Sequence, residues 1–177
     1  MRTCFQVILI LSVYSSNAYC QIDMSNIDIH TYYDSLRTEM VGKELSNIVF
    51  TDSSENQFDL ESLKGKVVAI NIWAFGCKPC TDEMPDLNEL VEKYNDHVIF
   101  LSILGDGKGP LNNEIYRRIQ KMNFKYATVS MDKKLSEAYG LLMVFPTHLI
   151  IGKNGKVLDL ILGPNVEKIE STIKSDL

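Results

Sequence analysis

Cysteine is scarce in this chain of 177 residues, which contains only four. Two of them, Cys4 and Cys20, lie within the first 20 residues, so a chain processed after Cys20 keeps only Cys77 and Cys80. One pair cannot build the framework of several disulfides that stabilises many small secreted domains. The only internal bridge that remains, with the spacing Cys-x-x-Cys, is therefore expected to serve chemistry.

An excess of basic residues is also missing, because 23 Asp and Glu outnumber 18 Lys and Arg and give a formal net charge of -5. No basic stripe runs along the sequence, so a nucleic-acid partner is not expected. Internal repeats and low-complexity tracts are absent as well. A length of 177 residues suits a single domain with a sizeable core.

Long apolar runs are likewise lacking, since Phe5–Val13 near the N-terminus is too short to span a bilayer comfortably. With Arg2 before it and a plausible cleavage region at Asn17–Cys20 after it, residues 1–20 have the features of a secretory signal. Cleavage after Cys20 places the chain outside the cytosol, and so does lipidation of Cys20, which would tether the protein to a membrane. The remaining alternative is that this segment forms an N-terminal strand or helix of the fold.

Residues 21–41 are polar, with scattered apolar side chains at Tyr32, Tyr33 and Leu36. They could contain a short helix, and we interpret them as a linker or a loosely docked arm. The folded domain is expected to span residues 42–177.

Strands and helices are expected to alternate through this domain. Short apolar runs predict buried strands, and apolar residues spaced by three and four predict amphipathic helices. Asn154-Gly155 is a strong signal for a tight hairpin turn. The order of elements implies an α/β domain with a central mixed sheet and helices on both faces. The predicted elements are a hairpin over 47–51 and 57–58, strands at 67–73, 98–104, 126–129, 148–151 and 157–162, and helices over 80–94, 111–122, 133–139 and 166–173.

Cys77 and Cys80 stand where the buried strand 67–73 gives way to a predicted helix. Unpaired backbone N–H groups and the helix dipole stabilise a thiolate at Cys77, and such a position lowers the pKa of a cysteine thiol. Pro79 rigidifies the first helical turn, where its missing N–H costs little. Lys78 either adds a positive charge that favours the thiolate or is a solvated side chain. The arrangement predicts a redox-active dithiol.

Other functions of the pair remain open. Zinc would need four ligands, and beyond Cys77 and Cys80 the chain offers only three histidines. A copper-binding assembly factor could use both cysteines and His148, because Cu(I) accepts soft thiolates. A thiol peroxidase needs a threonine just before its reactive cysteine, where this chain has Phe75 and Gly76. His148 could also carry protons or simply pack in its strand. No resident metal or cofactor is expected.

Five separated motifs occur in an order typical of one family. They are residues 63–68 (LKGKVV), Trp73 with the Cys-x-x-Cys pair and Glu83-Met84-Pro85, Ala138-Tyr139-Gly140, Phe145-Pro146-Thr147, and residues 152–157 (GKNGKV). On these residues the chain resembles the extracytoplasmic TlpA/ResA-like thiol–disulfide oxidoreductases from about residue 42 onward. The resemblance implies a thioredoxin fold with an N-terminal β-hairpin extension. Two departures are Gly76, where the family usually has tryptophan, and residues 140–145, which lack a common glycine.

The resemblance also implies roles for the residues around the pair. Cys77 would attack a substrate disulfide, and Cys80 would resolve the mixed disulfide. Glu83 would exchange protons with the thiols, unless it is simply an acid favoured in the first helical turn by the dipole. Asn71 stands where thioredoxins carry a buried aspartate, which leaves Glu83 as the available proton acceptor.

Residues farther along the chain would form the substrate surface. Pro146 is similar to the family's cis-proline, which faces the cysteine pair and leaves neighbouring backbone free for a peptide. Phe145 and Thr147 would flank the substrate. Trp73 and Phe75 would form an apolar collar, or are aromatic residues of the core and of a loop.

The expected function is therefore disulfide exchange outside the cytosol. The family's best-known targets are the haem-site cysteines of apocytochrome c, which suggests reduction of a disulfide in another exported protein. The protein would then need a membrane thiol–disulfide electron donor to become reduced again. The direction of exchange depends on the reduction potential of the pair.

Overall fold

The computed structural model describes residues 28–105, 112–131, 135 and 144–177. The predicted signal at 1–20 lies outside these residues, as do nearly all of the predicted helix 133–139 and most of the segment 140–145. The described elements are α1 (Ile29–Met40), β1 (Val49–Thr51), β2 (Gln57–Asp59), β3 (Val67–Trp73), α2 (Lys78–Tyr94), β4 (Val98–Leu104), α3 (Asn113–Ile119), the short 3-10 helix η2 (Gln120–Met122), β5 (Ala127–Val129), β6 (Thr147–Ile151), β7 (Val157–Leu162) and α5 (Val166–Lys174).

A mixed five-stranded sheet forms the centre, with the strand order β5-β4-β3-β6-β7. Strands β3, β4 and β5 run parallel, whereas β6 is antiparallel to both β3 and β7. All seven residues of β3 are buried because both faces of the sheet are covered. The expected central mixed sheet flanked by helices and the hairpin β1–β2 are confirmed.

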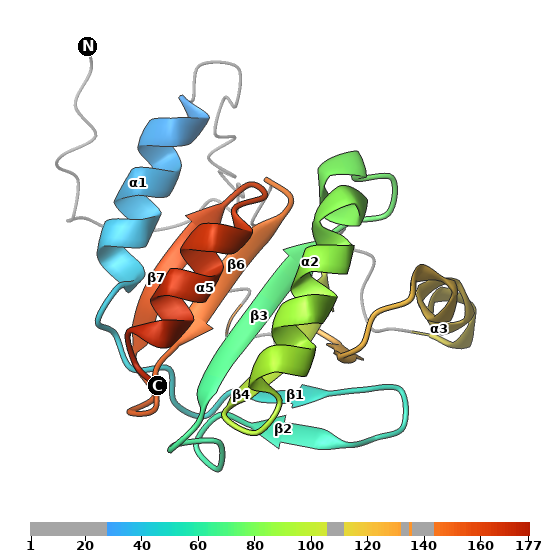
Figure 1. Ribbon diagram of the computed structural model, residues 1–177, viewed down its shortest axis with the longest axis horizontal. Coiled ribbons are helices and arrows are strands. Elements are labelled where there is room, and N and C mark those ends of the chain that lie inside the picture. Colours follow the sequence, from blue (N-terminus) through green and yellow to red (C-terminus); the bar gives the residue numbers. More distant parts are fainter. Residues whose placement is uncertain (1–27, 106–111, 132–134, 136–143) are drawn as a thin grey trace, which may run out of the picture.

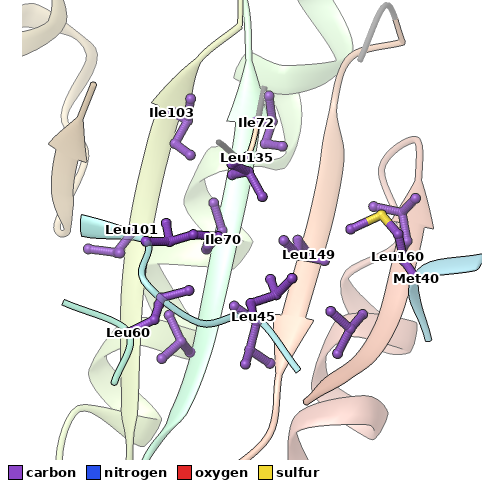
Figure 2. Close-up of a cluster of buried hydrophobic side chains, with 14 of the residues drawn as sticks. Met40, Leu45, Leu60, Ile70, Ile72, Leu101, Ile103, Leu135, Leu149 and Leu160 are labelled. Carbon is purple, nitrogen blue, oxygen red and sulfur yellow. The ribbon is translucent and has the colours of Figure 1, made fainter. Parts of the chain in front are cut away.

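The two faces of the sheet pack against different elements. Helices α2 and α5 cover one face (Figure 1), where alternate residues such as Ala69 and Ile150 meet Leu87 and Ile169. The opposite face carries the larger apolar cluster, in which Ile70 and the other alternate residues of the strands pack under the N-terminal part of the chain (Figure 2). Because both faces of the sheet are covered, a functional site is expected at one end of the strands.

Helix α1 lies within residues 21–41, where the sequence allows a short helix in a linker or loosely docked arm, and its described residues 29–40 are firmly docked. Tyr33 and Met40 are each 1% exposed, and Leu36 is buried beside them. The Tyr33 hydroxyl accepts a hydrogen bond from the backbone N–H of Val144 (2.9 Å), and Arg37 is paired with a buried aspartate of β7. Because the apolar residues recur at spacings of three and four, they form one stripe along a helix that packs firmly on the domain.

The chain after α1 reaches both edges of the central sheet. At the β7 edge, the Gly42 N–H donates to Val157 O (2.8 Å) and the Val157 N–H donates to Lys43 O (2.9 Å). At the β5 edge, the Ser130 N–H donates to Thr51 O (3.0 Å). A single N-terminal segment thus connects the two outer strands.

Glu170 of α5 links helices α2 and α5, which cover the same face of the sheet. It accepts hydrogen bonds from Lys93 Nζ and from the Tyr94 hydroxyl, each at 2.7 Å, and pairs with Lys174 at 3.0 Å. These contacts, led by Lys93, lower the pKa of Glu170 to about 2 from an ordinary value of 4.5. The carboxylate therefore ties α5 to the end of α2 in its charged form.

Replacing Glu170 with glutamine should lower the thermal unfolding midpoint by a few degrees at most at neutral pH, because the contacts are solvent-exposed. A carboxyl with a lowered pKa in the folded state stabilises that state above its ordinary pKa and loses this effect as the pH falls. The difference from the wild type should thus shrink between pH 4.5 and about 2. Thermal unfolding across that range is the measurement, with the exposed Glu89→Gln on α2 as control. A difference independent of pH would contradict the role of the charge.

Among the residues that the structure describes, none of the helices combines the length and apolar character needed to cross a membrane.

Candidate active site

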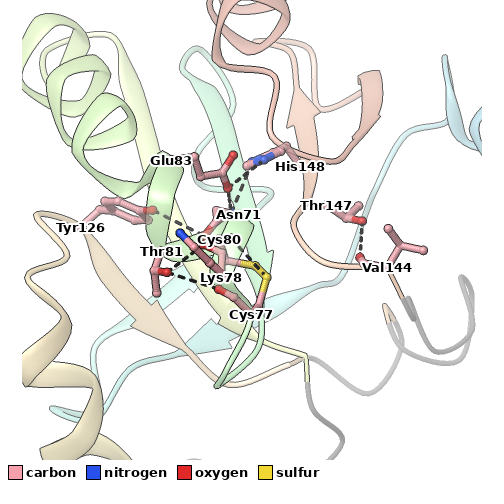
Figure 3. Close-up of a disulfide and its surroundings, with 10 residues drawn as sticks. All are labelled: Asn71, Cys77, Lys78, Cys80, Thr81, Glu83, Tyr126, Val144, Thr147 and His148. Atoms are coloured by element: carbon pink, nitrogen blue, oxygen red, sulfur yellow. Dashed lines mark hydrogen bonds and ion pairs between the residues drawn. A yellow bond between two sulfur atoms is a disulfide. The ribbon is translucent and has the colours of Figure 1, made fainter.

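Cys77 and Cys80 form a disulfide at the start of α2, with their Cα atoms 5.4 Å apart (Figure 3). Strand β3 ends at Trp73, and a short turn through Gly76 leads into the pair. Gly76 has a φ of +79°, a left-handed conformation that glycine adopts without strain, which favours it over the expected tryptophan. Cys77 is partly exposed, whereas Cys80 is buried at 4% exposure. The two sulfurs are therefore unequal in their access to a partner protein.

The sulfur of Cys77 occupies the N-cap position of α2. Its Sγ accepts a hydrogen bond from the backbone N–H of Cys80 at 3.2 Å, and Pro79 occupies the first turn. An anion at this position is stabilised by the helix dipole and the free N–H groups. Lys78 adds little to this effect, because its side chain is 82% exposed and is paired with Asp82 at 2.6 Å. The helix end, more than Lys78, favours a thiolate at Cys77.

Two kinds of aromatic side chain lie near the cysteine pair, one buried in the core and one partly exposed. Trp73 is fully buried in a cluster that includes Cys80, so it belongs to the core and not to an exposed collar. Phe75 is partly exposed and meets the edge of Trp73, with ring centroids 5.2 Å apart. The guanidinium of Arg118 lies 3.9 Å above the Phe75 ring. Phe145 packs against the same cluster, as does Phe124.

Pro146 stands directly before β6, and its peptide bond with Phe145 is cis. Thr147 pairs with Ile72 in β3, so the proline lies beside the end of the strand that leads to the disulfide. The side chain of Thr147 is fully buried and donates a hydrogen bond to Val144 O (2.7 Å). It points away from the disulfide in Figure 3. The side chain of Thr147 thus anchors the preceding loop, and a substrate beside Pro146 would meet the backbone of this residue.

A row of polar residues crosses four strands on the face covered by α2. Asn71 of β3 is opposite Ser102 of β4 on one side and His148 of β6 on the other, and Ser102 is opposite Thr128 of β5. We call these four residues the polar row. Ser102 and Thr128 share a hydrogen bond of 2.8 Å, and Trp73 Nε1 donates to Ser102 Oγ (3.2 Å). All four side chains are buried, so the row is a structured polar layer inside the core.

Glu83 of α2 lies over the polar row and is itself only 4% exposed. Its Oε1 accepts a hydrogen bond from Asn71 Nδ2 (3.4 Å) and lies 3.2 Å from His148 Nε2. Its Oε2 has no hydrogen-bond partner among the described residues. The Tyr126 hydroxyl donates to Asn71 Oδ1 (3.5 Å); burial raises the pKa of Tyr126, and the charge of Glu83 raises it further. A buried carboxylate therefore stands three residues after Cys80 on the same helix.

A cavity of about 500 Å³ opens beside Glu83, between α2 and the turn into α5. Its wall contains four carboxylate side chains and no cationic one. The lining residues are Pro79, Asp82, Glu83, Asp86, Pro164, Asn165, Val166 and Glu167. The carboxylate of Glu83 is thus bordered by the disulfide's helix on one side and by an open space on the other.

Sequence reasoning missed Arg118, Tyr126 and the two hydroxyls of the polar row. Ser102 and Thr128 each interrupt an apolar strand, which is a usable signal, as it was for Asn71 and His148. Arg118 gives no such signal, since its contact depends on where α3 lies. Within the described parts of the chain, no group of three or more His, Cys, Asp or Glu is placed to hold a metal ion. His148, weighed as a copper ligand, contacts Asn71 and Glu83.

The Redoxin family matches residues 40–177 of this chain. The chain belongs to the Redoxin family. This redoxin is 33% identical over 135 residues to thiol-disulfide oxidoreductase ResA of Bacillus thuringiensis (strain Al Hakam), covering 76% of the chain and 77% of that relative. It is 24% identical over 128 residues to ResA of Bacillus subtilis (strain 168), covering 72% and 70% respectively.

Solved structures share the fold of this redoxin. The thioredoxin domain of a thiol-disulfide oxidoreductase from Bacteroides vulgatus matches with a TM-score of 0.61 and 21% identity, covering 75% of this chain and 97% of that one. An exposed lipoprotein thioredoxin from Streptococcus pneumoniae strain TIGR4 matches with a TM-score of 0.61 and 23% identity, covering 72% and 98%. The predicted thioredoxin fold is confirmed.

This redoxin is a ResA-like thiol–disulfide oxidoreductase, and Cys77–Cys80 is its dithiol/disulfide pair. The predicted enzyme class is confirmed. Such an activity implies protein disulfide substrates and redox partners.

Proposed function

We propose that this redoxin reduces disulfides of exported proteins, with Cys77 as the attacking thiol and Cys80 as the resolving thiol. The observation that carries the proposal is the unequal burial of the two sulfurs. Cys77 is partly exposed at a helix N-cap, where a thiolate is stabilised, while Cys80 is buried on the side of Glu83. A substrate can reach the first sulfur and not the second.

The reaction follows from this asymmetry. The Cys77 thiolate attacks one sulfur of the substrate disulfide, that bond breaks, and the released substrate thiolate takes a proton from water. Cys80 then gives its proton to Glu83 and attacks Cys77 Sγ, which releases the second substrate thiolate. Two electrons pass from the protein to the substrate, and the Cys77–Cys80 disulfide observed here is the product. A membrane thiol–disulfide donor would reduce it again.

Glu83 suits the role of proton acceptor because it follows Cys80 by three residues on the same helix, and Asn71 and Tyr126 beside it cannot fill the role. Asn71 has an amide side chain, which does not accept a proton at neutral pH. Burial raises the pKa of Tyr126, so its phenol stays protonated. The cavity beside Glu83 offers a path for the proton to reach solvent. A general base must lie within hydrogen-bond reach of the proton that it takes, directly or through one water.

The substrate surface is formed by Phe75, Phe145 and the cis Pro146. The partly exposed Phe75 carries the Arg118 guanidinium on its face, so this surface combines apolar area with positive charge. The finer proposal is that the substrate is an exported polypeptide with a closely spaced cysteine pair, as in an apocytochrome c haem site. Export by residues 1–20, with or without a lipid at Cys20, would bring the two together.

A peptide with an oxidised Cys-x-x-Cys-His sequence tests this function. The reduced protein should reduce it stoichiometrically, and equilibration with glutathione should give a potential nearer to about −270 mV, as in reducing thioredoxins, than to about −120 mV, as in strong oxidants. A peptide with the cysteines ten residues apart is the control. An oxidising potential, tight binding of Cu(I) without thiol exchange, or faster turnover with hydrogen peroxide than with the peptide would overturn the proposal.

A further inference from the structure

We propose that His148 is a positioning residue for this reaction: it fixes Glu83 Oε1, so that Glu83 Oε2 is the atom that takes the proton of Cys80. The inference rests on the proposed function, in which Glu83 is the proton acceptor. It adds a residue from β6, 65 positions away from Glu83 along the chain, to the machinery that the Cys-x-x-Cys helix carries.

The direction of the hydrogen bonds around Asn71 assigns the proton of His148. The Tyr126 hydroxyl donates to Asn71 Oδ1 (3.5 Å), which leaves the amide nitrogen as a donor on the other side. That nitrogen lies 3.4 Å from His148 Nδ1 and 3.4 Å from Glu83 Oε1. The amide nitrogen of Asn71 is only a donor, so His148 Nδ1 acts as the acceptor of this contact. In a neutral imidazole, the proton is then on Nε2.

Nε2 is the ring nitrogen that faces the carboxylate. It lies 3.2 Å from Glu83 Oε1, within ion-pair distance, and has no hydrogen-bond partner among the described residues. Both side chains are 2% exposed, so water does not compete for this contact. Asn71 thus donates to Oε1, and the buried Nε2 of His148 lies beside the same oxygen. The other oxygen, Oε2, is buried and unpartnered within the described chain, and it is left to receive a proton.

To take the proton of Cys80, Glu83 must be a carboxylate with one oxygen free to accept it. Burial disfavours a carboxylate, whereas each N–H donated to it favours the carboxylate over the acid. Without the Nε2 contact, Oε1 would lose a neighbour that holds the carboxylate in place, and Glu83 would accept the proton of Cys80 less readily. The resolving step should then slow at neutral pH, while attack by the exposed Cys77 should not change.

Other ionisable groups lie on the elements that surround His148 and Glu83. On α2 they are Cys80, Asp82, which is paired with Lys78, and Asp86. Across the cavity α5 contributes Glu167, and the segment before β5 contributes Tyr126. On β7, Ile161 is opposite His148, and Asp159 farther along is paired with Arg37 and Lys168. None of these groups comes between His148 Nε2 and Glu83 Oε1.

The two thiol steps can be observed separately with DTNB, a chromogenic aromatic disulfide. Attack by Cys77 on DTNB forms a mixed disulfide and releases one thionitrobenzoate, and attack by Cys80 on Cys77 forms the protein disulfide and releases the second. Stopped-flow absorbance of the reduced protein thus gives the rate of each step across a pH range. His148→Phe keeps a ring of similar size and removes the donor, whereas His148→Gln keeps an N–H donor in its place.

We expect His148→Phe to slow the second release about tenfold at pH 7 and to move its pH midpoint upward, since a hydrogen bond to a charged group is worth about a factor of ten or more. The first release should be unchanged, and His148→Gln should restore much of the second. The matched control is His97→Phe, an exposed histidine just before β4, beyond the end of α2 opposite the cysteine pair. A midpoint that stays at the wild-type value in His148→Phe, or that moves as far in His148→Gln, overturns the inference.

A double-mutant cycle separates this inference from the proposed function. If His148 acts through Glu83, then adding His148→Phe to Glu83→Gln should cause no further shift in the pH profile. An equal shift in both backgrounds overturns the inference. If Glu83→Gln alone leaves the second release and its pH profile at the wild-type values, the role of Glu83 in the proposed function fails first.

Nitrogen-edited NMR of the imidazole tests the assignment in the unmodified protein, so the inference stays falsifiable if the phenylalanine variant does not fold. The ring of His148 should show the neutral tautomer with its proton on Nε2 at pH 7. A proton on Nδ1 at that pH, in either the neutral or the charged ring, overturns the inference.

Discussion

Cys77→Ser should reduce disulfide turnover to the background rate, whereas Cys80→Ser should leave a single attack that stops at the mixed disulfide. Cys77 provides the sulfur that a partner can reach, and a serine hydroxyl at neutral pH does not replace a thiolate as nucleophile. Cys80 is buried, so it cannot take over the first attack. Insulin reduction driven by a dithiol measures turnover, and mass spectrometry of the Cys80→Ser protein detects the covalent complex.

Each cysteine variant is the control for the other, because both lose the same disulfide. Equal stability of the two variants in thermal unfolding would show that the difference in chemistry does not come from folding. Turnover that survives in Cys77→Ser, or a mixed disulfide trapped through Cys80, would reverse the assignment of attacking and resolving thiols.

Tyr33→Ala should lower the free energy of unfolding by about 3–5 kcal/mol, the range observed for truncating a large buried aromatic side chain. The ring is 1% exposed, and its hydroxyl accepts the N–H of Val144, which the truncation leaves without this partner. Tyr33→Phe should cost only about 1 kcal/mol, because it removes the hydrogen bond and keeps the ring. Urea unfolding followed by the fluorescence of Trp73, the single tryptophan, measures both.

Tyr32→Ala is the matched control for this measurement. Tyr32 precedes Tyr33 on α1, is of the same residue type and is 39% exposed. Its truncation should cost less than about 1 kcal/mol. If both alanine variants unfold at the same urea concentration as the wild type, α1 does not contribute to the stability of the domain, and the packed helix described above is not a part of its core.

The elements around the cysteine pair could be predicted from the sequence because their signals are local. The seven apolar residues of β3 and the proline in the first turn of α2 are contiguous patterns. Helix α1 was harder to interpret, since its few buried residues are dispersed among polar ones. Whether such a stripe docks depends on a complementary surface, here the edge near β7, which the local sequence does not show.

The arrangement of the polar row was beyond local reasoning for a related reason. Asn71 and His148 could each be recognised as polar residues in apolar strands, yet their contact depends on the register of β3 against β6. A shift of one residue would turn either side chain to the opposite face. The same dependence on register determines that the side chain of Thr147, the last residue of the Phe-Pro-Thr motif, is buried in the core.

The N-terminal segment that crosses from β7 to β5 also bears on how the protein avoids association with itself. The outer strands of an open sheet offer unpaired N–H and C=O groups that can recruit strands from other molecules. Residues 42–43 engage part of β7, and Thr51 engages the end of β5, so one continuous stretch of chain protects both borders of the sheet. At these points the sheet is less open to pairing with strands of the partner polypeptides that the enzyme must meet at its exposed cysteine.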